Sequence, residues 1–226
     1  MQLTVKLADK YFADYGTIIT SFGFTEWVDI LARLHRMKYF EAPASSKFHL
    51  SVPGGLYLHS VGVVERALKM RAGIPDLPPW KIILAGLLHD IGKCGTLYAE
   101  GVYPRYLPGK PGEPYSVNRP QLFTVRDLSA MYAREWGVPW DVVQAILLHD
   151  GLYCDQNKPY IDLYTNLSLL LTNADNLQAK VFETDTEAFL SLAEGSKSAP
   201  DKAGAGQGNG EAPGNGPKAQ DGPGRP

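Results

Sequence analysis

The stretch LAGLLHDIGK, residues 84–93, places an adjacent histidine and aspartate inside an apolar run with helical spacing. Its leucines and isoleucine favour burial, whereas His89, Asp90 and Lys93 are tolerated in a protein interior only when they are paired or bound to an ion. At about 3.6 residues per turn, Lys93 is predicted one turn beyond His89 on nearly the same helix face.

An imidazole beside a carboxylate offers one neutral and one anionic donor, and this combination suits a divalent transition metal. For the dipeptide alone, a core histidine that is hydrogen-bonded to an aspartate without any ion is the favoured interpretation. The metal hypothesis therefore needs further ligands from other parts of the chain.

Two other predicted helices carry an inward polar residue. After Gly55, spacings of three and four place His59 on an apolar stripe with Leu56, Val63, Ala67 and Met70. In the helix predicted from about residue 162 to 192, Asp175 shares a largely apolar side with Leu171 and Phe182. Two histidines and two aspartates can surround one ion and leave positions open for water and substrate.

Length and composition limit the alternatives. A chain of 226 residues supports one core and a tail, and its formal net charge of −2 supplies no global basic field for nucleic acid. No apolar run reaches membrane-spanning length, and the N-terminus lacks the pattern of a signal peptide. Two cysteines without a disulfide spacing fit a reducing cytoplasm, so we expect a cytoplasmic protein without a membrane partner.

The chain divides into three parts. Residues 1–25 form an N-terminal segment of uncertain structure, whose β-branched stretches favour a strand. Residues 26–193 carry the helical periodicity, including helices at 120–136 and 139–149, and are predicted to form one helical domain. Residues 194–226 are rich in Gly and Pro and lack aromatic residues, so we predict a disordered tail that is dispensable for chemistry.

A polar, Pro- and Gly-rich loop is predicted at residues 94–119. Loops of this length inside a compact domain are usually functional or disordered, and the aromatic content argues against plain disorder. We interpret the loop as a lid or as one wall of a substrate site. Its tyrosines are Tyr98, Tyr103, Tyr106 and Tyr115.

The order His59, His89-Asp90, Asp175 resembles that of the HD-domain metal-dependent phosphohydrolases. GGLYLHSVGVVERAL (54–68) is similar to the family's first-histidine segment, LLHDIGK (87–93) to its second, and LLLTNADNLQA (169–179) to its last-aspartate helix. EAPASSKFH (41–49) resembles a bacterial and phage subgroup of small HD hydrolases. The resemblance covers roughly residues 26–185.

The resemblance implies an all-α fold, a compact helical bundle, and hydrolysis of a phosphoester or phosphoanhydride bond, often in a nucleotide. His59, His89, Asp90 and Asp175 match the ligands of one divalent ion, which can be Mn, Zn, Co, Ni or Fe. Lys93 matches a lysine that neutralises the substrate phosphate. A nucleotide-like small molecule is the expected substrate, and the oligomeric state is unknown.

Relatives with two metals add two histidines between the HD pair and the last aspartate. His149 fits the second of these, but Val125 stands where the first is expected, and no histidine lies between 90 and 148. We therefore expect one ion and regard a complete second metal site as doubtful. His149 can instead act as a general acid or base or bind phosphate, or it can be a structural helix-end histidine.

Further substrate contacts are less defined. His49 lies ten residues before His59 in a connector from which it can reach substrate, and Arg126 is a candidate phosphate contact, as are Lys47 and Arg119. For all four, a solvated side chain is the competing interpretation. Three other functions stay open: a nuclease acting on single-stranded nucleic acid, a non-catalytic nucleotide-binding module that kept the fold, and an HD-type di-iron oxygenase.

Overall fold

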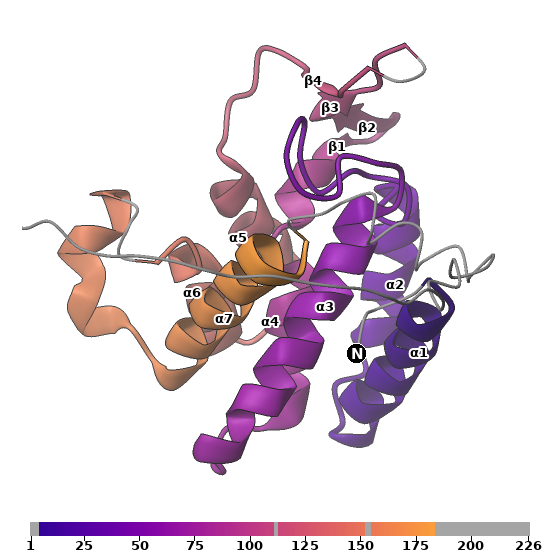
Figure 1. The fold of residues 1–226 in the computed structure, drawn as a ribbon. Coiled ribbons are helices and arrows are strands. Elements are labelled where there is room, and N and C mark those ends of the chain that lie inside the picture. Colours follow the sequence, from indigo (N-terminus) through magenta and orange to yellow (C-terminus); the bar gives the residue numbers. More distant parts are fainter. Residues whose placement is uncertain (1–4, 111–112, 152–154, 184–226) are drawn as a thin grey trace, which may run out of the picture. The chain divides into compact units, whose positions relative to one another are not determined.

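The computed structural model describes residues 5–110, 113–151 and 155–183. Helices dominate this part of the chain, as the all-α prediction requires (Figure 1). The α-helices are α1 (Val5–Ser21), α2 (Trp27–Arg36), α3 (Gly55–Met70), α4 (Pro79–Leu88), α5 (Val125–Glu135), α6 (Trp140–Leu148) and α7 (Asn166–Leu177). The short 3₁₀ helices are η1 (Arg71–Gly73), η2 (Ile91–Cys94) and η3 (Asp155–Leu163), and the π-helical turn is η4 (Gln178–Phe182).

Helix α3 is the central element of the fold. It packs against α1, α4 and α7, and every residue from Gly55 to Ala67 is buried, the polar ones included. Helix α4 lies between α3 and α6, and its residues Ile82–Leu88 are buried as well. Because both helices are enclosed on all sides, a polar side chain on either has to find its partner inside the protein.

The α4 helix begins with Pro79 in its first turn, as predicted from the Pro-Pro pair, but it ends at Leu88 rather than continuing to residue 93. His89 caps the helix, and the chain then tightens into η2. Gly92 is required in this turn, since a Cβ there would lie 2.2 Å from the Val125 carbonyl oxygen of α5. The Gly92 N–H donates to Ser129 Oγ at 2.9 Å, which ties η2 to α5.

Three sequence expectations are corrected. The N-terminal segment is helix α1 rather than a strand, because Ala8, Tyr15 and Ile19 share an inward face that packs on the core. The segment 94–119 is not an irregular loop, since it folds into two antiparallel hairpins. These pair β1 (Gly95–Tyr98) with β2 (Gly101–Pro104) and β3 (Tyr106–Leu107) with β4 (Ser116–Val117).

The third correction concerns the long helix predicted at 162–192. Thr165 caps α7 by accepting from the Ser168 N–H, and the α-helix ends at Leu177, where η4 takes over. The predicted disordered tail at 194–226 lies outside the described residues. None of the helices in the described ranges is long and apolar enough to cross a membrane.

Candidate metal centre

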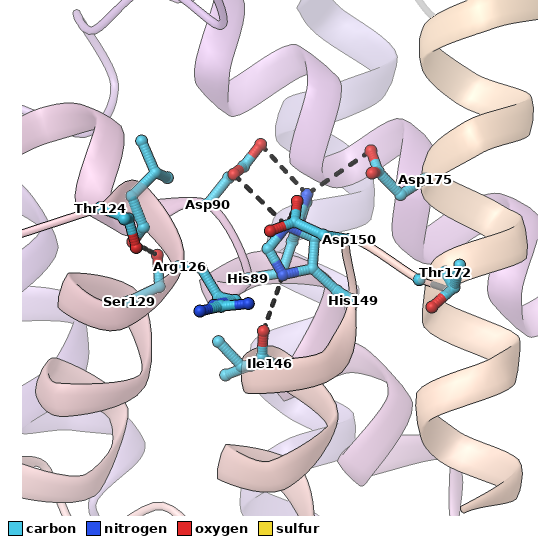
Figure 2. A network of polar contacts seen from close by, with 12 residues as sticks. His89, Asp90, Thr124, Arg126, Ser129, Ile146, His149, Asp150, Thr172 and Asp175 are labelled. Carbon is cyan, nitrogen blue, oxygen red and sulfur yellow. Dashed lines mark hydrogen bonds and ion pairs between the residues drawn. The ribbon is translucent and has the colours of Figure 1, made fainter. Parts of the chain in front are cut away.

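Four donor atoms from three helices meet in the interior. The atoms are His59 Nε2 from α3, His89 Nε2 and Asp90 Oδ2 at the end of α4, and Asp175 Oδ1 from α7. Figure 2 shows Asp90 and Asp175 on either side of His89. Both histidines and Asp90 are buried, and the Asp175 side chain is 22% exposed.

The spacing of these atoms matches that of ligands around one ion. His59 Nε2 lies 3.3 Å from His89 Nε2, 3.1 Å from Asp175 Oδ1 and 3.7 Å from Asp90 Oδ2. His89 Nε2 lies 3.3 Å from Asp90 Oδ2 and 3.7 Å from Asp175 Oδ1. Tetrahedral ligands held about 2.1 Å from an ion lie about 3.4 Å from one another. The donor set therefore fits a divalent metal.

The outer hydrogen bonds of the histidines fix which ring nitrogen faces the centre. His59 Nδ1 lies 3.1 and 3.2 Å from the two carboxylate oxygens of Glu183, and His89 Nδ1 lies 2.8 Å from the Gly86 carbonyl oxygen. These partners can only accept, so each Nδ1 is the donor, and when a ring gives up its second proton the lone pair of Nε2 points inward. This is the arrangement of metal-ligating histidines.

The electrostatics of the centre also favour a cation. Burial lowers the pKa of His59, but Glu183 and Asp175 outweigh it and raise that pKa to about 9. Burial likewise lowers the pKa of His89, but Asp90 and Asp175 outweigh it and raise that pKa to about 10. Burial raises the pKa of both aspartates, yet their positive neighbours hold each well below its usual range. The carboxylates thus attract positive charge to the point where the donors meet.

A comparison with known protein families bears on these same residues. The family model for the HD domain matches residues 56–180, which is more than half of the chain. The chain belongs to the HD domain family. HD domains bind divalent metals and are generally hydrolases that act on phosphoester bonds. The matched range runs from before His59 to beyond Asp175. Comparison with curated proteins and with solved structures found no match.

The lysine of the HDIGK segment pairs with the aspartate of the HD dipeptide rather than stacking over its histidine. Lys93 Nζ forms an ion pair with Asp90 Oδ2 across the η2 turn, and the Lys93 side chain is 14% exposed. Burial lowers the pKa of Lys93, but Asp90 outweighs it and the pKa is raised. Because α4 ends at Leu88, Lys93 lies in a 3₁₀ helix and not in the α-helix from which its position was predicted, but the cation does lie at the HD centre.

His149 lies on the other side of Asp90, at the end of α6. Its Nδ1 donates to the Ile146 carbonyl oxygen at 2.7 Å, and its Nε2 lies 3.7 Å from Asp90 Oδ1 (Figure 2). His89, Asp90 and His149 form a second group whose donor atoms can hold an ion. At the site of the missing histidine, Val125 begins α5 and presents an apolar side chain. One HD-bound ion remains our prediction.

Arg126 is not a solvated surface charge. Its side chain is 13% exposed, and Nη1 donates to Asn157 Oδ1 at 2.8 Å. The solvated surface charge that the sequence left open for Arg126 is therefore wrong, and the predicted phosphate contact stays a prediction.

His49 lies beside His59 and Glu183, and these three residues form a further group of possible metal donors. The two rings are 5.3 Å apart, and His49 Nε2, which is buried, lies 4.0 Å from Glu183 Oε2. Burial and then His59 lower the pKa of His49, so the neutral ring is favoured. This position favours support of His59, whereas the substrate contact predicted for His49 stays a prediction.

Glu183 is the residue that sequence reasoning missed. Its carboxylate is fully buried, accepts from His59 Nδ1 and also accepts from Gln178 Nε2 at 2.7 Å. Gly62 makes room for this contact, because a Cβ there would lie 2.4 Å from Gln178 Nε2. Regular α-helical phase carries no signal for Glu183, since the π-helical turn between Gln178 and Phe182 changes the register.

The hairpins line one side of a cavity beside this HD centre. The cavity measures about 440 Å³, and Lys93 and Cys94 belong to its wall. Burial raises the pKa of the Cys94 thiol.

Proposed function

We propose that this HD-domain chain is a metal-dependent phosphohydrolase that acts on nucleotides. In this proposal His59, His89, Asp90 and Asp175 hold one divalent transition metal ion, which can be Mn, Zn, Co, Ni or Fe. The observation that carries it is the spacing of the two histidine Nε2 atoms, which lie 3.3 Å from each other and 3.1 to 3.7 Å from one carboxylate oxygen of Asp90 and one of Asp175.

When bound, such an ion polarises a phosphoryl oxygen and brings the pKa of a coordinated water toward neutrality. The chain's own residues complete the site. Lys93 stays protonated beside Asp90 and has N–H groups left to donate to a phosphate oxygen. His149 carries its proton on Nδ1 and directs the lone pair of Nε2 toward Asp90, so it can accept a proton from an attacking water.

Small nucleotides fit this chain better than long nucleic acids. The formal net charge is −2, and several phosphate contacts would require a basic surface. The binding-module alternative is weakened by the intact set of four candidate ligands, because a module that needs no metal has no use for two histidines and two aspartates whose donor atoms converge.

The test is metal analysis of the purified protein together with a phosphate-release screen over nucleotides with Mn²⁺, Co²⁺ and Ni²⁺. Asp90→Ala should lose metal and turnover together while circular dichroism shows the helical content retained. Asp14→Ala, which removes an exposed carboxylate paired with Lys10, is the control and should change neither.

Three results would count against the proposal. Retained metal and turnover in Asp90→Ala would remove the metal centre from the mechanism. Background activity of the wild type with every metal would favour the binding module. A steep salt dependence of binding to a short oligonucleotide would favour the nuclease.

A further inference from the structure

The cavity beside Lys93 is larger than a phosphate needs. Its volume of about 440 Å³ lies within the range of about 300–1,000 Å³ that is typical of pockets for whole small molecules. One wall comes from the segment after α2, which contributes Ala42 and Pro43, and another from the hairpins, which contribute Val102, Tyr106 and Tyr115.

Charge is confined to two places in this wall. Lys93 connects the cavity to the metal centre through its ion pair with Asp90. Lys38 and Glu41 are exposed and have opposite charges, so they provide no net attraction for a second anionic group. The remaining lining residues are aliphatic, proline, tyrosine and one cysteine: Met37, Ala42, Pro43, Pro53, Cys94, Val102, Pro104, Tyr106, Leu107, Pro108 and Tyr115.

An occupant that complements these walls has an anionic end near Lys93 and a flat, largely apolar body. Tyr106 and Tyr115 are half-buried, so their rings offer faces on which a planar group can stack. Apart from the two tyrosine hydroxyls, the cavity wall has few polar side chains that can form hydrogen bonds with the edge of a planar ligand.

We infer that the cavity beside Lys93 binds the base of a mononucleotide by stacking and accepts all four bases with little discrimination. The inference rests on the proposed function for the placement of the phosphate at the metal centre. Every base has a π-face, so stacking without edge-specific hydrogen bonds tolerates any of them.

The experiment measures binding of the four ribonucleosides to the full-length protein by saturation-transfer NMR, with ribose as the probe that lacks a base. All four nucleosides should bind with dissociation constants within about fivefold of one another, because stacking is tolerant of sequence. Ribose should not bind.

Two Val→Trp variants locate the binding. Val102→Trp fills the cavity and should weaken nucleoside binding at least about tenfold, the effect of losing a stacked base. Val28→Trp, at an exposed position of α2 that does not line the cavity, should bind like the wild type. If Val102→Trp fails to fold, Tyr106→Ala should weaken binding while Tyr106→Phe preserves it.

Each outcome separates this inference from the proposed function. Nucleoside binding that is absent, or unchanged in both Val102→Trp and Tyr106→Ala, overturns the base site. Affinity for one base far above the other three overturns recognition by stacking alone. Nucleoside binding without phosphate release from any nucleotide would support the base site and contradict the proposed function.

Discussion

The sharpest prediction concerns Glu183, which contacts the outer ring nitrogen of the candidate ligand His59. Glu183→Gln should weaken binding of a divalent metal by about 10–100-fold, the usual effect of losing an outer partner of a ligating histidine. The wild-type carboxylate accepts from His59 Nδ1 at 3.1 and 3.2 Å and from Gln178 Nε2 at 2.7 Å. An amide has one accepting oxygen, so its NH₂ group would face at least one of these donors.

The magnitude follows from the bond that is lost. A hydrogen bond to a buried charged group contributes about 1.5–3 kcal/mol. Since about 1.36 kcal/mol corresponds to a tenfold change in an equilibrium constant, the loss converts to roughly 10–150-fold in affinity. Glu183 is fully buried, so solvent does not screen this interaction.

The assay is a Mn²⁺ or Zn²⁺ titration against a competing chelator at two pH values. Glu183 helps to raise the pKa of His59 to about 9, so at pH 7 the wild type releases a proton when it binds metal. In the variant His59 has a lower pKa, so a proton competes less strongly with the metal for its Nε2 atom. Its deficit in affinity should therefore be larger at about pH 9.5 than at about pH 7.

Glu65→Gln is the matched control. Glu65 is a buried glutamate on the same helix as His59, but it pairs with Lys69 at 2.6 Å and belongs to none of the described groups of metal donors. Equal affinities of Glu183→Gln and the wild type at both pH values would refute the reasoning. Equal losses in both variants would attribute the effect to general destabilisation.

Other predictions test the centre, the fold and the tail. In the metal-free protein the pKa values of His59 and His89 are about 9 and about 10, above the 6.5 of an ordinary histidine. The two protonated histidines therefore stabilise the folded state fully below pH 6.5, and this stabilisation is lost as the pH rises through about 9 and 10. Differential scanning fluorimetry should show that the Tm of the EDTA-treated protein falls as the pH rises above 6.5. Over the same pH range the increase in Tm that Mn²⁺ causes should grow. A Tm of the metal-free protein that rises with pH would contradict this prediction. Gly92→Ala should lower the free energy of unfolding by at least about 1–3 kcal/mol in urea titrations, because its Cβ meets the backbone of Val125 2.2 Å away; an unchanged midpoint would show that α5 adjusts freely. Ending the chain after Ala193 should leave kcat/KM unchanged, and a large loss would show that the composition of the tail was misinterpreted.

Local sequence patterns were sufficient for much of the centre. The apolar periodicity around His59 and Asp175 predicted that both lie on inward helix faces, and the structure brings them together with His89 and Asp90. This succeeds because the inward face of a helix depends on residues within one or two turns, which periodicity records directly.

Local patterns failed where the backbone leaves regular geometry. The α4 helix ends at Leu88, so Lys93 pairs with Asp90 across a 3₁₀ turn and not along a continuous α-helix. The β-branched residues of α1 favoured a strand, but packing against α3 and α4 overrides so weak a propensity. The hairpins of the Tyr-rich segment likewise lacked a clear alternating pattern.

The sequence by itself determined the all-α class, the four candidate ligands and their order along the chain. Only the tertiary structure decided which groups support them: Glu183 contacts His59 across 124 positions, and the His49 ring lies 5.3 Å from the same imidazole. It also decided that Lys93 joins the metal centre to a cavity lined by the hairpins. The physical reason is that helical periodicity specifies which face is buried, whereas the partner that face meets depends on how distant segments pack.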